Sequence, residues 1–154
     1  MWVAEVQSYL FSAMGKLVYK KSFNIGTIRL LKNLVKDSNW EEMKEALRIA
    51  TKGHKEVIAI GSGGNINKIF SMSKRKDGKP LTLELLRDYY KELSNVTLEE
   101  RINKYGLRED RADVIVPALQ IYTNAMRWAD AQEIYVPKIG LVDGLIQHLW
   151  EEVK

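Results

Sequence analysis

The sequence predicts an α/β fold in which helices cover a β-sheet, and three observations lead to that prediction. The apolar run 57–60 ends directly in glycines, two runs of β-favouring residues flank Gly15, and amphipathic helical spacing fills most of the second half. A short continuous apolar run is typical of a strand covered on both faces. Strands that alternate with helices usually form one sheet with helical cover. No repeat or interdomain linker divides residues 1–154, so we expect a single domain.

The first elements are predicted to be a hairpin and a helix. The apolar runs 9–11 and 17–19 would form the two arms of the hairpin, with Gly15 in its turn. Segment 26–36 then has the apolar spacing of a helix. The stripe expected to face the core consists of Ile28, Leu31, Leu34 and Val35.

A capping box, the buried strand and a further helix follow. Ser38 and Glu41 have capping-box spacing, which predicts that a helix covers about 40–51. The strand at 57–60 leads through glycines into a predicted helix at 65–72. The positions expected to be buried on these two helices are Met43, Ala46, Leu47, Ala50, Ile66, Ile69 and Phe70.

The second half is predicted to be mainly helical. Segment 73–80 is polar and turn-rich, which favours an exposed loop. Helices are expected at 81–93 and 111–128, and Pro117 should either bend the second helix or mark its first turn. Between them, Thr97 and Glu100 form another capping box, with Gly106 as a stop signal. The last expected elements are a strand at 133–136, a glycine-containing segment at 140–144 and a helix that ends near Val153.

Composition limits the classes of protein that the chain can represent. It has no cysteine, which excludes disulfides and thiolate metal sites and favours a reducing, cytoplasmic compartment. No apolar run approaches the roughly 20 residues that a membrane-spanning helix needs. The N-terminus carries Glu5 and no basic cluster, so we do not interpret it as a secretory signal.

Charge is unevenly distributed along the chain. Residues 1–80 contain 15 Lys and Arg against 7 Asp and Glu, whereas residues 81–154 contain 9 against 13. A basic half suggests an anionic partner such as a phosphate chain, a nucleotide or nucleic acid, and a solvated surface is the alternative. The basic cluster is formed by Lys74, Arg75 and Lys76. Aromatic residues are not interleaved with it, so nucleic-acid binding is not favoured.

The glycine-rich segment after the predicted strand is the main candidate site. It consists of Gly61, Ser62, Gly63, Gly64 and Asn65. Glycines at a strand-to-helix turn let the backbone approach a phosphate, and the helix that follows offers free N–H groups. Tight packing without a ligand is the alternative interpretation of the same pattern.

Other catalytic sites are not favoured. Ser62 has the wrong spacing for a hydrolase nucleophile elbow, and the two histidines, His54 and His148, are predicted to lie at the surface. Two distant histidines without cysteine exclude an ordinary zinc site. Three aspartates could assist a magnesium ion bound to phosphate, although solvated or capping roles are the alternative. They are Asp110, Asp113 and Asp143.

Four segments together resemble the exopolyphosphatase/guanosine pentaphosphate phosphohydrolase family of the sugar kinase/actin-like superfamily. They are 22–30, 58–66, 100–118 and 140–145, in the family's order and spacing. The resemblance implies an α/β, actin-like (ribonuclease-H-like) lobe, whose mixed sheet has helices on its faces. It also implies that the chain corresponds to the C-terminal lobe, with the first strand and the phosphate loop missing.

The resemblance also implies where a ligand would lie. It places the glycine segment beside the phosphate/nucleotide cleft, and it places Arg111 and Asp113 in a stretch that helps to build that cleft. The expected polyanion contacts are Arg29, Arg111, Lys74, Arg75 and Lys76. Magnesium is the family's cofactor, and none is expected for this chain alone. The chain departs from the family at Ala118, where glycine is common, and at 142–144, where the family's arginine is absent.

The largest departure from the family's pattern is at the start of the chain. The family's first lobe, with its glutamate general base, and its Asp-x-Gly-Gly-Gly-Ser-x-Glu loop have no counterpart in residues 1–9. A one-nucleotide shift in codons for such a loop would yield Met-Trp-Val-Ala-Glu-Val-Gln, the first seven residues of this chain. We therefore hypothesise an out-of-frame start, which the upstream DNA would test. Without the loop and the base we expect no catalytic residue and no hydrolysis by this chain alone.

Two functions remain open at this point. The chain is either one lobe of a phosphohydrolase that removes terminal phosphate from polyphosphate or guanosine pentaphosphate, or a non-catalytic module for polyanion binding or oligomerisation. The absence of a central strand would leave unpaired backbone at a sheet edge, which favours a homo-oligomer. No membrane partner is expected.

Overall fold

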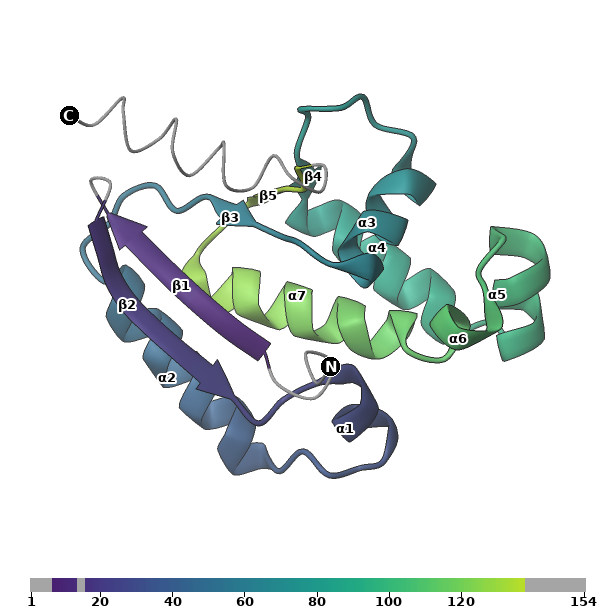
Figure 1. Cartoon of the computed structure of the whole chain (residues 1–154), viewed down its shortest axis with the longest axis horizontal. Coiled ribbons are helices and arrows are strands. Elements are labelled where there is room, and N and C mark those ends of the chain that lie inside the picture. The colour runs from purple at the N-terminus through teal and green to yellow at the C-terminus, as the bar shows by residue number, and fades with distance from the viewer. Residues whose placement is uncertain (1–6, 14–15, 138–154) are drawn as a thin grey trace.

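The computed structural model describes residues 7–13 and 16–137 (Figure 1). The elements in order are β1 (Gln7–Ala13), β2 (Lys16–Phe23), α1 (Thr27–Leu31), α2 (Asp37–Thr51), β3 (Ala59–Ile60), α3 (Gly64–Ser73), β4 (Leu81–Thr82), α4 (Leu83–Ser94), α5 (Leu98–Tyr105), α6 (Glu109–Ala112), α7 (Ile115–Ala129) and β5 (Glu133–Tyr135). The predicted hairpin turn at Gly15, segment 140–144, Asp143, the final helix and His148 lie outside the described residues.

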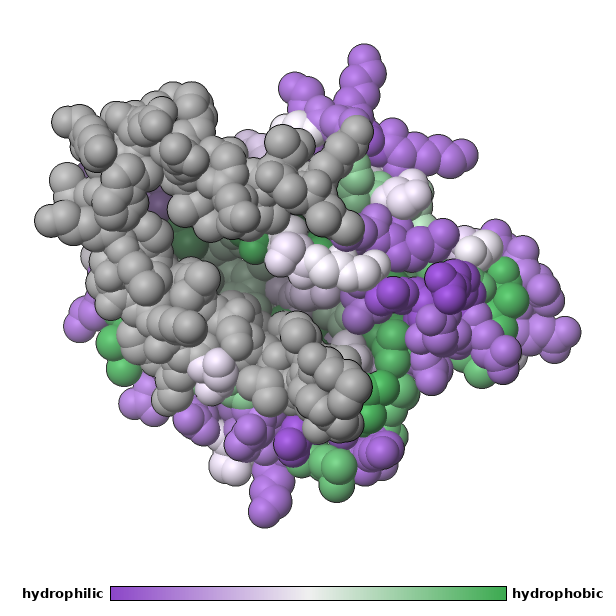
Figure 2. All heavy atoms as spheres, viewed as in Figure 1, coloured by the Kyte–Doolittle hydropathy of each residue, from purple (hydrophilic) through white to green (hydrophobic). Residues whose placement is uncertain are grey.

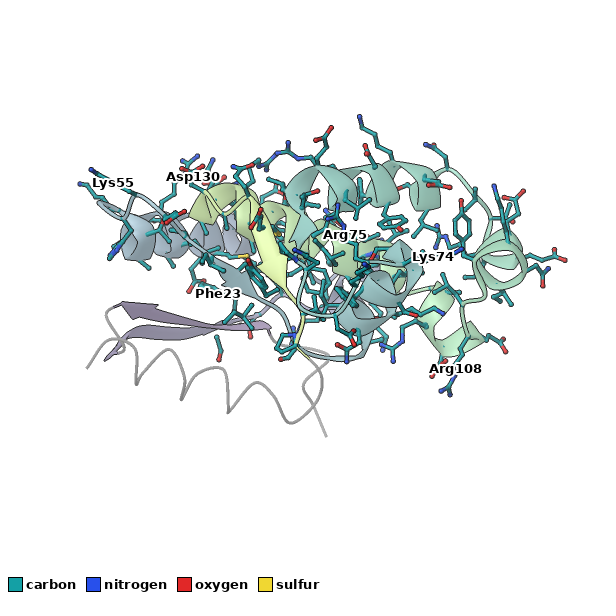
Figure 3. All side chains as sticks on the ribbon, turned by 90° about the horizontal axis from the view of Figure 1, so that it is seen from above. Phe23, Lys55, Lys74, Arg75, Arg108 and Asp130 are labelled. Carbon is teal, nitrogen blue, oxygen red and sulfur yellow. The ribbon has the colours of Figure 1, made fainter. Side chains whose placement is uncertain are left out.

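The strands form two separate sheets within the described residues. β1 and β2 pair antiparallel as the predicted hairpin. The second sheet has the order β3-β5-β4, in which β3 runs parallel and β4 antiparallel to β5. This arrangement confirms the expected mixed sheet. Figure 3 shows the hairpin as a layer of its own beneath the helices.

Helix α7 is the central element of the fold, because its side chains belong to two hydrophobic clusters (Figure 1). Ile115 and Leu119 pack with α3, α4 and the mixed sheet, whereas Ile121 and Ala125 pack with α2 and the end of the hairpin. A helix that buries several sides must be apolar around most of its circumference. The long apolar segment expected at 111–128 therefore marks the helix that joins the two halves of the core.

The second cluster fixes the hairpin end and α2 against α7. Phe23, the last residue of β2, and Ile25, which follows the hairpin, are buried with Met43 of α2. The Trp40 and Trp128 rings meet edge to face, with centroids 5.9 Å apart and planes 69° apart. Aromatic pairs prefer this geometry because the positive ring edge meets the negative ring face.

Two predictions near α1 and α2 are wrong. The predicted helix 26–36 is only the five-residue α1, because Asn33 adopts a left-handed φ of 53° and ends the helical path. Leu31 and Leu34 are consequently 42% and 56% exposed instead of facing the core. Helix α2 begins earlier than Ser38 implied. Its N-cap residue is Lys36, whose backbone N–H donates a hydrogen bond at 2.8 Å to Oδ1 of Asn39, the third residue of the helix.

The strand predicted at 57–60 exists, but it is shorter than expected. Only Ala59 and Ile60 pair with β5, and Ile58 is 60% exposed. The expected cover on both faces is therefore absent at Ile58 and incomplete at Ile60, which is 40% exposed. β3 lies at the edge of the three-stranded sheet in the described part of the chain.

The second half follows the prediction more closely. Thr97 Oγ1 accepts from the Glu100 N–H at 3.1 Å, while Glu100 Oε2 accepts from the Thr97 N–H at 2.9 Å, which confirms the capping box. Gly106 ends α5 with φ 65°. The predicted helix 111–128 is divided into α6 and α7, and Pro117 lies in the first turn of α7. Prolines are tolerated there because the first helical N–H groups have no intrahelical acceptor.

Candidate functional site

The glycine segment forms the turn between β3 and the first residues of α3. The Gly61 N–H donates to the Tyr135 carbonyl at 2.8 Å, which continues the pairing with β5. A Cβ on Gly61 would lie 2.8 Å from Ile134 Cδ1 and 3.1 Å from Ile66 Cγ1. At this first glycine, the packing interpretation of the sequence pattern is therefore sufficient.

The later glycines serve a different purpose. Gly63 is the residue before α3 and has φ 118°, a conformation that side chains of L-residues rarely adopt. A Cβ on Gly64 would lie 2.5 Å from Arg111 Nη2 and 2.6 Å from Nη1. Glycine at position 64 thus leaves the space in which the guanidinium of Arg111 rests against the start of α3.

Arg111 is the cation of the site. It comes from the short helix α6, is half-buried, and donates from Nη1 to Asn65 Oδ1 at 2.9 Å. Within residues 16–137 it forms no ion pair with a carboxylate. A guanidinium with a neutral hydrogen-bond acceptor keeps its full charge and has further N–H donors to offer.

Electrostatics at this turn favour an anion. The N-terminus of α3 carries the positive end of the helix dipole, and the Arg111 charge lies beside it. The positive end of the α3 dipole and the Arg111 guanidinium repel each other, and a negative group bound between them would remove this repulsion. The arrangement is therefore suited to a phosphate oxygen, which the α3 amides and the guanidinium could both contact.

Tyr122 from α7 lies beside the site, and it was not among the candidate residues predicted from the sequence. Burial raises the pKa of Tyr122 to about 12, while Arg111 and a hydrogen bond from the Ile66 backbone amide oppose the rise. These two opposing causes place the tyrosine ring close to Arg111 and to the first turn of α3. Its place on a helical stripe gave no signal of this proximity.

The remaining basic candidates do not join the turn. Lys74, Arg75 and Lys76 follow the other end of α3, roughly 15 Å along a ten-residue helix. They are exposed on the loop between α3 and β4, where Figure 2 shows hydrophilic side chains projecting from the body of the protein. Arg29 lies on α1, a helix that packs against α7. Only Arg111 among the five predicted polyanion contacts is described in contact with the glycine segment.

The two acidic candidates described by the structure are close to Arg111 in the sequence, but they lie on a different surface from the glycine turn. Asp110 and Asp113 line an open hollow of about 550 Å³ together with Arg108 and Glu109. Arg108 Nε lies 3.3 Å from Asp110 Oδ1, and Figure 3 shows Arg108 at the end of the protein away from Lys55. This mixed-charge surface is solvated.

Residues 7–13 and 16–137 contain no group of three or more His, Asp or Glu side chains that could hold a metal ion. His54 is exposed in the connection between α2 and β3, and Ser62 is exposed on the turn. Among the helices described, none combines the length and the apolar character that crossing a bilayer requires.

Comparison with known proteins shows the fold. No protein-family model and no curated protein matches the chain. A solved Ppx/GppA family member from Aquifex aeolicus is 21% identical with a TM-score of 0.68, and the match covers 96% of this chain and 54% of that one. An exopolyphosphatase from Cytophaga hutchinsonii is also 21% identical with a TM-score of 0.69, and the match covers 98% of this chain and 55% of that one.

The chain thus spans about half the length of the solved structures that it matches. The type II variant of the Aquifex aeolicus Ppx/GppA phosphatase gives the same result, with a TM-score of 0.71 and 53% of its length covered. The predicted fold class, an α/β actin-like lobe with a mixed sheet, is confirmed. The resemblance to this family drawn from four sequence segments is confirmed at the level of the fold.

Proposed function

We propose that this chain is the C-terminal lobe of an exopolyphosphatase-type phosphohydrolase and that its glycine turn contacts the phosphate chain of the substrate. The observation that carries the proposal is the position of Arg111, which lies over Gly64 at the positive end of α3 without a carboxylate partner in the described residues. The fold shared with solved Ppx/GppA proteins supports the same assignment.

The reaction of the complete enzyme would be hydrolysis of a phosphoanhydride. Water attacks the terminal phosphorus of polyphosphate or guanosine pentaphosphate, the bond to the bridging oxygen breaks, and inorganic phosphate leaves. The attacking water must lose a proton to a base, and the leaving phosphate chain must be stabilised as negative charge develops on it. The Gly63–Asn65 amides and Arg111 are suited to the second task.

The first task needs a base near the turn, and no carboxylate of the described residues pairs with Arg111 there. Arg111 has no carboxylate within ion-pairing distance, and no metal-binding group of acids is present in the described segments. We therefore propose that this lobe binds phosphate without hydrolysing it, and that a second lobe supplies the base. We propose that any magnesium arrives with the phosphate, because no group of three or more His, Asp or Glu side chains is found in the described segments.

The decisive experiment measures phosphate release from polyphosphate and from guanosine pentaphosphate with magnesium present. We expect no turnover by the chain alone and turnover when a polypeptide carrying the other half of the fold is added. The Gly64→Ala chain should give less turnover at the same concentration of substrate, whereas a substitution at exposed Lys52 should have no effect. Turnover by the isolated chain would contradict the proposed inactivity, and a lack of any polyphosphate binding would contradict the proposed role of the turn.

An oligomerisation or polyanion-binding module is the second candidate, and the edge position of β3 favours it. Ile58 and Ile60 are exposed beside a strand that pairs on only one side in the described part of the chain. An unpaired edge with apolar side chains is suited to strand addition from a second copy. Light scattering at high protein concentration tests this, because a monomer there would contradict the homo-oligomer.

Three further proposals concern the compartment, nucleic acid and the basic loop. The absence of cysteine is in keeping with the reducing cytoplasm, which we propose as the compartment. The basic first half could also attract nucleic acid, and binding that falls steeply as salt rises would reveal such an activity. The loop that carries Lys74, Arg75 and Lys76 is exposed, and it remains the proposed region for weak polyanion contact.

A further inference from the structure

A second polar groove lies between α4 and α7. It has a volume of about 250 Å³. Its lining consists of Arg87 and Tyr90 from α4, and Gln120, Thr123, Asn124 and Arg127 from α7. Two arginines and no carboxylate line the groove, which distinguishes it from the mixed-charge hollow beside α6.

The groove is separate from the glycine turn. Its α7 residues are spaced at i, i+3, i+4 and i+7, so they form one stripe along the helix. Tyr122, which contacts the turn, is about 150° around the helix from the middle of that stripe at 100° per residue. The two sites therefore face opposite sides of α7.

The arginine of α7 is held in place at the groove. Arg127 Nη2 donates to Asn124 Oδ1 at 3.1 Å, and its guanidinium lies 5.7 Å from the centroid of the Trp128 ring. These contacts leave most of its five N–H donors available. A guanidinium fixed by a neighbouring amide and an aromatic ring loses less rotamer entropy when it binds an anion.

The other lining groups add donors around the same space. Arg87 forms no ion pair within residues 16–137, although Glu84 lies three residues before it on α4. The Tyr90 hydroxyl and the Gln120 amide are on half-buried residues, whereas Thr123 Oγ1 is already bonded to the Leu119 carbonyl at 2.9 Å. The groove thus has two positive charges and several neutral donors without a matching negative charge.

We propose that this groove binds a small phosphate oxyanion of the size of inorganic phosphate or pyrophosphate. Guanidinium groups recognise phosphate through paired N–H donors, and two exposed arginines line this groove. The volume is below the roughly 300 Å³ at which ligand pockets for larger molecules begin, which favours a small anion over a complete nucleotide. This site does not depend on the function proposed for the glycine turn.

Residue-resolved NMR of the full chain during a pyrophosphate titration tests the proposal. We expect saturable shifts in the side-chain amides of Gln120 and Asn124 and in the Nε–H groups of Arg87 and Arg127. In the Arg87→Gln/Arg127→Gln variant, the affinity should fall at least about tenfold, because charge-assisted hydrogen bonds are lost. Shifts at Gly63 and Gly64 report on the other site in the same spectra.

A matched variant controls for loss of charge. Arg48→Gln/Lys52→Gln removes two exposed cations from α2 and its end, away from the groove, and should leave the affinity within about twofold of the unmodified chain. Equal weakening by both double variants would overturn the proposal, because it would show diffuse charge attraction. Unchanged affinity in the groove variant, or shifts confined to the glycine turn, would overturn it as well.

Discussion

Arg111 Nη1 donates a hydrogen bond to Asn65 Oδ1 at 2.9 Å, across 46 positions of sequence. This contact fixes α6 to the first turn of α3 and holds the guanidinium over Gly64. It brings a positive charge to a helix end that is already positive. A positive side chain at this position stabilises the fold less than an acidic one would, because an acidic residue at the N-terminus of α3 interacts favourably with the helix dipole.

Substitution of the two glycines should separate packing from ligand binding. Gly61→Ala would place Cβ 2.8 Å from Ile134 Cδ1 in the core, so we expect a loss of about 1–3 kcal/mol in the free energy of unfolding. Gly64→Ala meets only the movable end of Arg111 and gains helix propensity, so stability should change by less than about 1 kcal/mol. Chemical denaturation measures both.

Polyphosphate binding by the same two variants provides the second readout. Gly64→Ala should displace the guanidinium and weaken binding about tenfold. Normal binding by Gly64→Ala would contradict a role for Arg111 in contacting phosphate. A large loss of stability in that variant would instead show that the arginine cannot move.

A pair of leucines tests whether α7 is the centre of the core. Leu119 of α7 is fully buried, and Leu119→Ala should reduce the free energy of unfolding by about 2–5 kcal/mol. Leu34→Ala removes the same atoms from a side chain that is 56% exposed, so its effect should stay within about 0.5 kcal/mol. Similar losses in the two variants would show that Leu34 is covered by another part of the protein in solution.

Sequence patterns correctly predicted those elements that are stabilised by contacts between residues close together in the sequence. The Thr97 and Glu100 capping box formed as expected because both partners lie within one helical turn. The short strand β4 was missed, since Leu81 and Thr82 become a strand only by pairing with Ile134 and Glu133 far along the chain. The extent of α1 was wrong because the left-handed conformation of Asn33 cannot be read from apolar spacing.

The same distinction explains why only part of the candidate site was predicted from the sequence. The glycine turn is contiguous, so its position between a strand and a helix was readable from the sequence. The partners of that turn, Arg111 and Tyr122, come from α6 and α7 and are placed by tertiary packing. The division of the five basic candidates, with only Arg111 at the turn, also required the three-dimensional arrangement.

Two caps that look alike in sequence should respond differently to substitution. Thr97→Ala removes an observed acceptor for the Glu100 N–H and should cost about 0.5–2 kcal/mol in the free energy of unfolding. Ser38→Ala should stay within about 0.5 kcal/mol, because Ser38 lies exposed inside the first turn of α2. Thermal unfolding of both variants checks the assignment, and an equal loss would restore Ser38 as a cap.

The buried Tyr122 should make stability fall in strong alkali. Its folded pKa of about 12 exceeds the unfolded value of 10.0, so the unfolded chain loses this proton first as pH rises. The contribution of Tyr122 to the free energy of unfolding is complete below about pH 10 and is lost progressively up to about pH 12. The loss is at most roughly 1.4 kcal/mol per pH unit. Tyr122→Phe should flatten this part of the stability profile. Tyr105 also has a pKa raised to about 12, through its hydrogen bond to Glu92, so Tyr105→Phe measures what this second tyrosine contributes to the same fall. An alkaline fall in Tyr122→Phe as steep as in the unmodified chain would show that Tyr122 does not cause it.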